Sequence, residues 1–490
     1  MLSREGPQSV CFCAMISAGE EIERQEGARA RRVAFYSLGC RVNYDELDCL
    51  RGRFVQEGWR AVPFEQEAEL FVINTCTVTQ VADADSRKII RRAVRNKPPG
   101  GLVVVTGCYA QRDPEALRRL EGVDLILGNS EKSRLFDLVQ RHLADRRLAG
   151  DLWVADEPKT REFLRRAPGA PDRGPRTRAT LKVQDGCDEA CTYCIIPSVR
   201  GVSVSRPTGE ILREAEQLAA SGFREIALTG VNTGSYGKDF PDSLEGASSS
   251  SSASPDARDL AALIRALQAL DLPLRYRLNS LEPPSITPAL LDALEDCPSF
   301  CPHFHIPLQH GDSRILRRMG RGYDAEFYAE KIRSVQARFP EAGIGADVMI
   351  GFPGEEEEHF ENMKALLLDL APSYLHVFSY SVREGTPAER MPGHVPAEVK
   401  KHRARVMHDI EDQLRARFIE RMLGKTRPVL VEGKRGPLGG WTGLTDNFLR
   451  VEISPGTEKA GSLRENDFIL ATIKDSHSPK LAIATAETRS

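Results

Sequence analysis

The stretch VQDGCDEACTYCIIP, residues 183–197, decides the fold of this chain. It places Cys187, Cys191 and Cys194 in one short loop, with spacings of three and then two residues between them. A structural zinc site needs four ligands, and a closed four-iron cluster also uses four cysteines. Three thiolates on a four-iron cluster leave one iron open to a substrate or cofactor. The alternatives are a chance grouping of thiols and a zinc site completed by a distant histidine.

This loop resembles the cysteine loop of radical S-adenosylmethionine (SAM) enzymes. In those enzymes the open iron binds the amino and carboxylate groups of SAM. The resemblance implies a SAM-binding [4Fe-4S] cluster on Cys187, Cys191 and Cys194, and cleavage of SAM to a 5′-deoxyadenosyl radical.

The residues around the loop predict an α/β barrel. Strands are expected at residues 180–183, 225–229, 276–278, 303–307, 346–350 and 375–380, with helices between them. Six such units suggest a partial (β/α)6 barrel of the TIM type, with its chemistry at the C-terminal ends of the strands. The cysteine loop follows the first strand, where that rule places it. The serine-rich stretch within residues 241–257 cannot bury apolar surface, so a disordered insertion is expected there.

A second cysteine set precedes the barrel. Short apolar runs at 33–36, 70–73, 102–105 and 125–127 alternate with helical patterns and predict an open parallel α/β sheet. Three of these runs lead into Cys40, Cys76 and Cys108. Because the carboxyl ends of parallel strands lie along one edge, these cysteines should converge there. The alternative is that each is a small buried residue at a strand end.

The predicted order of domains follows from these patterns. We expect a disordered tail (1–31), the N-terminal cluster domain (32–145), a linker (146–177), the radical SAM domain (178–423) and a small β-barrel (424–490). A charged helix at about 396–423 precedes the last domain, whose short strands and glycine-rich turns suit an oligonucleotide-binding barrel.

Composition limits the class of protein. The chain has 490 residues, 11 cysteines and a formal net charge of −3. So few cysteines in so long a chain indicate reduced, metal-binding thiols in a cytoplasmic protein. No apolar run reaches the roughly 18 residues that a membrane helix needs. The slightly acidic balance argues against a globally basic nucleic-acid binder, so any RNA contact must use local patches.

With both cysteine sets placed, the chain resembles the methylthiotransferase family of radical SAM enzymes, from about residue 32 to the end. These enzymes insert a methylthio group into tRNA or a ribosomal protein, and end in a TRAM domain. The resemblance implies that Cys40, Cys76 and Cys108 hold an auxiliary [4Fe-4S] cluster. In the family scheme one SAM methylates a sulfur on that cluster. Another SAM makes the radical that removes the non-acidic C2 hydrogen of adenine.

Two segments resemble the branch that acts on N6-threonylcarbamoyladenosine (t6A) at tRNA position 37. They are NTCTVT at 74–79 and TGVNTGSYG at 229–237. The expected partners are therefore the anticodon stem-loop carrying t6A37, an electron donor and a sulfur source. The alternatives are modification of isopentenyl-A37 or of a ribosomal aspartate. A non-catalytic iron–sulfur RNA-binding protein is the alternative of another class.

Other residues carry weaker signals. Asn232 and Gln309 follow barrel strands, where they either contact SAM or bond within loops. His303 and His305 share one face of a strand, and a structural role is favoured over metal ligation. RNA contact is expected from a basic helix and from the terminal barrel, at Arg87, Lys88, Arg91, Arg92, Arg95, Lys425, Arg427, Lys434, Arg435 and Trp441. The remaining cysteines are expected to bind no metal, namely Cys11, Cys13, Cys49, Cys297 and Cys301.

Overall fold

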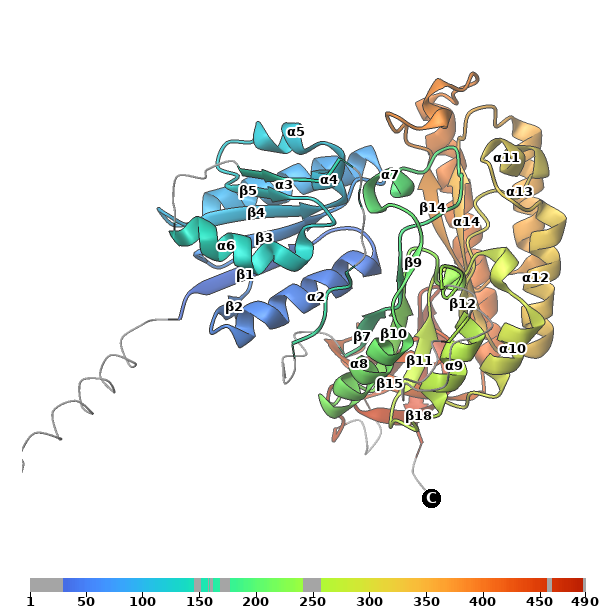
Figure 1. Cartoon of the computed structure of the whole chain (residues 1–490). Helices are drawn as coiled ribbons and strands as arrows, with labels where there is room; N and C mark the ends of the chain where they lie inside the picture. Colours follow the sequence, from blue (N-terminus) through green and yellow to red (C-terminus); the bar gives the residue numbers. More distant parts are fainter. Residues whose placement is uncertain are drawn as a thin grey trace, which may run out of the picture.

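The computed structural model describes residues 30–144, 151–156, 158, 162–167, 177–240, 257–455 and 461–487. The expected tail (1–31) and serine-rich insertion (241–257) lie almost entirely outside these ranges, as do Cys11 and Cys13. Figure 1 shows an N-terminal lobe beside a larger lobe that holds the rest of the described chain. None of the described helices combines the length and the apolar character that crossing a membrane requires.

The N-terminal lobe is built on a parallel sheet with strand order β2-β1-β3-β4-β5-β6 (Figure 1). Its strands are β1 (Arg32–Ser37), β2 (Arg60–Val62), β3 (Leu70–Thr75), β4 (Leu102–Gly107), β5 (Leu125–Leu127) and β6 (Asp151–Trp153). Both β3 and β4 are buried at every position. Such continuous burial is typical of central parallel strands that are covered by helices on both faces.

Two separate apolar cores pack against the two faces of this sheet. One face is covered by α2 (Arg41–Gln56) and α6 (Leu135–Ala144). The other is covered by α3 (Gln80–Asn96), α4 (Cys108–Arg112) and α5 (Pro114–Arg118). Helix α3 begins where it does because the Thr79 hydroxyl accepts a hydrogen bond from the Ala82 N–H at 3.1 Å.

The larger lobe contains an open half-barrel of six parallel strands. They are β7 (Ala179–Lys182), β10 (Glu225–Thr229), β11 (Arg275–Leu278), β12 (His303–His305), β13 (Gly343–Ile350) and β14 (Tyr374–Ser379). They form two three-stranded sheets, β11-β10-β7 and β12-β13-β14. The sheets adjoin where Tyr276 on β11 pairs with Phe300 in an isolated parallel bridge.

Helices cover the outside of the half-barrel (Figure 1). They are α8 (Thr208–Ala220), α9 (Leu260–Gln268), α10 (Pro288–Glu295), α11 (Ser313–Arg318), α12 (Ala325–Arg338) and α13 (Glu357–Leu370). Short elements connect the strands and helices of this lobe, namely β8 (Gln184–Asp185), α7 (Ile196–Arg200), β9 (Val204–Ser205), η2 (Thr233–Ser235), η3 (Pro283–Ser285) and η4 (Pro387–Arg390). In the N-terminal lobe, η1 (Lys132–Arg134) directly precedes α6.

The long helix α14 (Ala397–Met422) leads into a closed five-stranded barrel of order β15-β16-β17-β19-β18. Its strands are β15 (Thr426–Arg435), β16 (Trp441–Thr445), β17 (Arg450–Ile453), β18 (Phe468–Ser478) and β19 (Leu481–Ala486). A closed barrel of this size is consistent with a TRAM domain. The parallel N-terminal sheet, the partial α/β barrel and the terminal β-barrel together confirm the fold class expected from the sequence.

The terminal barrel closes the N-terminal end of the half-barrel. Arg275 and Arg277 both pair with buried Glu225 at 2.7 Å, and Arg275 and Glu225 are the first residues of β11 and β10. The same two guanidinium groups donate to backbone carbonyls of the terminal barrel. Phe448 completes the contact by stacking on His303, with ring centroids 4.3 Å apart. The end of the half-barrel that carries the cysteine loop is therefore the one left for chemistry.

Several short elements were not expected from the sequence. They include β2, β6, β8, β9, β16 and α4, none longer than five residues. The strands β2 and β6 lie at the edges of the sheet, where a three-residue pairing needs no continuous apolar run. Helix α4 begins at Cys108 itself, so the chain turns helical directly at the end of β4.

Candidate active site

The three N-terminal cysteines meet at one edge of the N-terminal sheet. Cys40 is the residue before α2, Cys76 follows β3 and Cys108 follows β4. Cys76 and Cys108 are buried, whereas solvent reaches Cys40. Burial, together with the neighbouring Cys108 and Cys40 thiols, raises the pKa of Cys76 to about 12. The thiols are therefore close enough to interact electrostatically, as the convergence of strand ends requires.

Two glycines make this convergence possible. Gly39 and Gly107 precede Cys40 and Cys108, with φ values of +89° and +101° that other residues rarely adopt. A Cβ on Gly39 would lie 2.7 Å from the Cys76 Sγ, and one on Gly107 would lie 2.4 Å from the Thr75 carbonyl oxygen. Any side chain at either position would therefore push its cysteine loop away from Cys76.

The second cysteine set lies in the loop after β8, at the open end of the half-barrel. Cys187, Cys191 and Cys194 are all half-buried, and none of the described cysteines forms a disulfide. Burial, together with the neighbouring Cys191 thiol, raises the pKa of Cys187 to about 11 and that of Cys194 to about 12. The Arg321 guanidinium lies 3.1 Å from the Cys191 Sγ, where its charge stabilises a thiolate.

The two cysteine sets lie near each other across the boundary between the lobes. Cys108 packs in one small buried cluster with Ile195 and Val199. Ile195 directly follows Cys194, and Val199 belongs to α7. Helices α4 and α7 accordingly lie side by side between the lobes in Figure 1. The amide nitrogen of Asn129 also donates to the Val199 carbonyl oxygen at 2.6 Å.

A buried network of charges holds the lobes together beside these loops. Glu46 on α2 accepts hydrogen bonds from Lys182 at 2.9 Å, from Arg200 at 3.0 Å and from Lys132. Asp185, two residues before Cys187, accepts from the same Lys182 and Arg200. Every member of this Glu46 network has at most 5% of its side chain exposed. Burial raises the pKa of Glu46, but these cations lower it more strongly. The pKa of Glu46 therefore lies well below the usual range.

Both cysteine sets fit the metal centres that the sequence implies. Each set offers three free thiols within the protein. The remaining described cysteines, Cys49, Cys297 and Cys301, are buried and belong to neither set. The raised pKa values of Cys76, Cys187 and Cys194 mean that metal must displace their protons. The protein packed around Cys40 and Cys191 raises the pKa of both thiols, whereas Arg200 lowers that of Cys40 and Arg321 lowers that of Cys191.

The weaker candidates have different environments. Asn232 is buried, its N–H donates to the Gln184 side chain at 2.9 Å, and its Oδ1 has no partner among the described residues. Gln309 has a φ of +68°, which is uncommon for a residue with a side chain. His303 is buried and bonds the Tyr374 hydroxyl at 2.7 Å. His305 instead bonds the Asp347 carboxylate.

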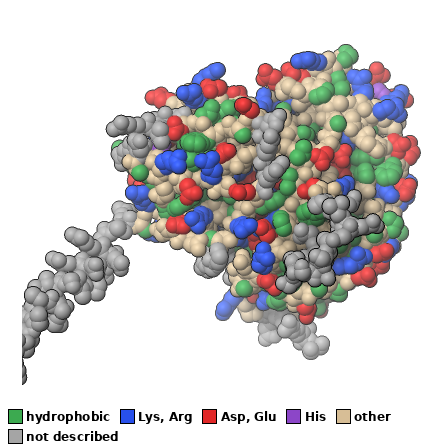
Figure 2. All heavy atoms as spheres, in the orientation of Figure 1, with side chains coloured by type: hydrophobic (Ala, Val, Ile, Leu, Met, Phe, Trp, Pro, Cys, Tyr) green, Lys and Arg blue, Asp and Glu red, His purple; other side chains and the backbone are tan. Residues whose placement is uncertain are grey.

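The candidates for RNA contact divide into paired and exposed side chains. Figure 2 shows basic and acidic groups intermingled on the visible face, so no large area of one sign is present there. Arg87 and Arg92 on α3 bond Tyr109 and Glu65, and Lys425 and Arg427 pair with Glu341 of the half-barrel. Exposed basic residues remain at Lys88, Arg91, Arg95, Lys434 and Arg435.

Sequence reasoning missed several charged residues at these sites. They are Glu46, Lys182 and Arg321. These residues interact with elements distant in sequence, and no local pattern distinguishes such residues from ordinary surface charges.

Comparison with known proteins agrees with this arrangement. Residues 181–367 match the Radical SAM superfamily and residues 32–128 match the Uncharacterized protein family UPF0004. The Threonylcarbamoyladenosine tRNA methylthiotransferase MtaB of Bacillus subtilis is 35% identical, over 87% of this chain and 91% of its own length. The protein of that name from Aquifex aeolicus is also 35% identical, over 88% and 98%.

More distant relatives widen the comparison. The tRNA-2-methylthio-N(6)-dimethylallyladenosine synthase of Geobacillus kaustophilus is 31% identical, over 90% of this chain and 80% of its own length. Among solved structures, the radical SAM methyltransferase TsrM of Kitasatospora setae has a TM-score of 0.53 at 18% identity, over 74% of this chain and 77% of that chain. That likeness shows the fold alone. On the sequence relatives and the matched superfamily, the chain belongs to the methylthiotransferase family of radical SAM enzymes.

Proposed function

We propose that this protein is a tRNA t6A37 C2-methylthiotransferase, which converts t6A37 to 2-methylthio-t6A37. The proposal is carried by the two sets of three cysteines on either side of the lobe boundary, joined by the contact of Cys108 with Ile195. A reaction that needs both a radical source and a sulfur donor requires two such centres close together. The names of the relatives from Bacillus subtilis and Aquifex aeolicus support the same substrate.

We assign Cys187, Cys191 and Cys194 to a SAM-binding [4Fe-4S] cluster, and Cys40, Cys76 and Cys108 to an auxiliary [4Fe-4S] cluster. When bound, these groups supply the electron that cleaves SAM and the sulfur that joins C2 of the base. Arg321 and Arg200 place positive charge beside the two sets of thiolates. The Glu46 network fixes the Cys40 loop relative to the loop of Cys187, Cys191 and Cys194, because it joins α2 to Asp185 and Arg200.

The substrate base has to leave its stack to reach a site between two lobes. A37 lies in a single-stranded loop, where an unstacked base can be splayed into a protein site. The exposed basic residues Lys88, Arg91 and Arg95 on α3 lie on the helix that begins four residues after Cys76. We assign phosphate contacts to these three residues and to Lys434 and Arg435 of the terminal barrel.

Anaerobic reaction followed by nucleoside mass spectrometry tests the function. Enzyme reconstituted with iron and sulfide, SAM and a chemical reductant should convert t6A37 of a transcript to its 2-methylthio form. The same transcript without the threonylcarbamoyl group serves as the matched control, and a transcript with isopentenyl-A37 tests the second candidate. That candidate is kept because relatives named for dimethylallyladenosine also match over most of the chain. Preference for the isopentenyl substrate would replace the proposed function by the second one.

A further inference from the structure

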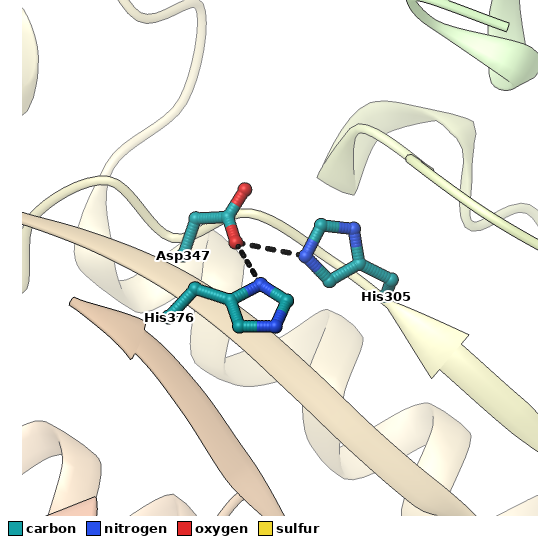
Figure 3. A group of neighbouring side chains, drawn as sticks. All are labelled: His305, Asp347 and His376. Carbon is teal, nitrogen blue, oxygen red and sulfur yellow. Dashed lines mark hydrogen bonds and ion pairs between the residues drawn. The ribbon is translucent and has the colours of Figure 1, made fainter. Parts of the chain in front are cut away.

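Three polar side chains from adjacent strands meet on one face of the half-barrel. His305 on β12, Asp347 on β13 and His376 on β14 point toward one another in Figure 3. Asp347 Oδ1 lies 2.8 Å from His305 Nε2 and 2.9 Å from His376 Nδ1. We call these residues the His–Asp–His cluster.

The His–Asp–His cluster faces the interior of the half-barrel, away from the covering helices. Ala346 and Val348, on either side of Asp347, are fully buried in the apolar core that the strands share with those helices. Because successive side chains of a strand point to opposite faces, Asp347 points inward. His376 pairs with Asp347 across β13 and β14, so it lies on the same face. The cluster therefore belongs to the sheet β12-β13-β14, whereas the second cysteine set follows β7 of the other sheet.

The spacing of the three polar atoms matches the spacing of ligands around a single metal ion. All three atoms lie within 4.8 Å of one another. Two ligands about 2.1 Å from one ion are about 3.0 Å apart at a right angle and about 3.4 Å apart at the tetrahedral angle. The separations of 2.8 and 2.9 Å from Asp347 Oδ1 are close to the first value. Both nitrogens also converge on the same carboxylate oxygen, which brings the three ligand atoms to one point.

Solvent reaches the His–Asp–His cluster, so an ion can enter it. The exposed fractions of its side chains are 15% for His305, 19% for Asp347 and 48% for His376. Neither His305 Nδ1 nor His376 Nε2 has a partner among the residues that the structure describes. Each neutral imidazole can therefore carry its proton on that second nitrogen and turn a lone pair toward the ion.

We propose that the His–Asp–His cluster binds a divalent first-row transition-metal ion, separate from the two assigned iron–sulfur clusters. Two imidazoles and one carboxylate are a ligand set that zinc and iron use in proteins, with further positions left to water or to a substrate oxygen. His305, for which the sequence favours a structural role, becomes a metal ligand in this assignment. The site needs no particular RNA substrate, so it goes beyond the proposed function and does not depend on it.

The alternative is a hydrogen-bonded triad without metal, in which both imidazoles donate to Asp347. Zinc separates the two, because its bond lengths identify the donor atoms. Zinc–sulfur bonds are about 2.3 Å long, whereas zinc–nitrogen and zinc–oxygen bonds are about 2.0–2.2 Å long. X-ray absorption therefore distinguishes zinc on the His–Asp–His cluster from zinc on either cysteine set.

The test uses full-length protein reconstituted anaerobically with iron and sulfide, then equilibrated with zinc sulfate and desalted. Wild type should retain stoichiometric zinc with only nitrogen and oxygen neighbours. Competition with a fluorescent zinc chelator should show weaker binding in His376→Ala and Asp347→Asn, by more than the about 10- to 100-fold that loss of an outer-shell partner costs. His394→Ala is the matched control, since His394 is exposed and bonds the Glu389 carbonyl oxygen outside the cluster.

Each outcome decides between the metal site and the triad. Zinc that both variants lose and His394→Ala keeps supports the metal site. Wild type that retains no zinc, or variants that bind zinc as tightly as wild type, would leave the hydrogen-bonded triad. Sulfur neighbours at about 2.3 Å would place the ion on cysteines and equally overturn the proposal. His376→Asp guards against a folding defect, because it keeps a ligand at this half-exposed position and should retain the ion.

Discussion

Replacing Glu46 by glutamine should destabilise the protein more than any single surface change. Glu46 and Asp185 supply two negative charges to Lys132, Lys182 and Arg200, and all five side chains are buried. The Glu46→Gln change leaves three cations facing one anion. Removing one partner from a buried ion pair typically costs about 3–5 kcal/mol. Burial already lowers the pKa of Lys132, so loss of its proton would relieve one charge and keep the cost near the lower end.

The magnitude matters because whole domains are stable by only about 5–15 kcal/mol. Urea unfolding of the metal-free protein, followed by circular dichroism, measures the change in free energy. Small-angle scattering of the variant in buffer should also show a larger radius of gyration, because Glu46 and Lys132 belong to one lobe and Lys182, Asp185 and Arg200 to the other. Addition of Lys132→Met removes one of the two surplus cations and should restore part of the lost stability.

A matched control is available on the surface of the same lobe. Glu65 pairs with Arg92 at 3.3 Å and has 62% of its side chain exposed, so Glu65→Gln should cost less than about 1 kcal/mol. If Glu46→Gln unfolds at the same urea concentration as Glu65→Gln, the buried network contributes nothing to stability and the reasoning fails. A double variant less stable than Glu46→Gln alone would equally contradict the charge count.

Three further results are expected. Cys76→Ala should lose methylthiolation but still cleave SAM, measured as 5′-deoxyadenosine, and loss of cleavage with sulfur insertion retained would reverse the two cluster roles. His303 is buried and its pKa lies well below 6.5, so only the unfolded state gains a proton as pH falls. The free energy of unfolding should therefore drop by about 1 kcal/mol from pH 6.5 to about pH 5.5, and by less in His303→Gln. An equally steep drop in that variant would rule out His303 as the cause. Arg435→Ala should weaken binding of any tRNA and reduce its salt dependence, measured by titration at several salt concentrations. Arg435 is exposed, and its guanidinium carbon lies 3.8 Å from the centroid of the Trp441 ring. An unchanged salt dependence would remove Arg435 from the RNA surface.

The parts of the fold predicted from the sequence are those set by local patterns. The apolar runs of β3 and β10 are continuous, and the structure places those strands at Leu70–Thr75 and Glu225–Thr229. Edge strand β2 lacks such a run and was missed. Cysteine spacing likewise identified a loop whose thiols are close in sequence, without needing any tertiary contact.

The parts that could not be predicted depend on contacts between distant elements. Glu46 reads as an ordinary polar residue of an amphipathic helix, and only the docking of the second lobe buries it. Asp347 and His376 lie on different strands, and sequence gives no register between them. Arg427 was expected to contact RNA, yet it pairs with Asp446 and Glu341 because the terminal barrel packs against the half-barrel at this point.

The attachment of the terminal barrel has a consequence for how this protein can be divided. Phe448 and the backbone carbonyls that accept hydrogen bonds from Arg275 and Arg277 cover the N-terminal end of the half-barrel. A chain truncated before residue 424 would leave buried Arg275 and Arg277 without these backbone acceptors. It would also open the N-terminal end of the half-barrel to water and dioxygen. The terminal barrel, to which we assign RNA contacts, is thus inseparable from the half-barrel, to which we assign the radical chemistry. Chimeras that exchange substrate specificity between relatives should therefore transfer the half-barrel and the terminal barrel together. A half-barrel that is active without the terminal barrel is not expected.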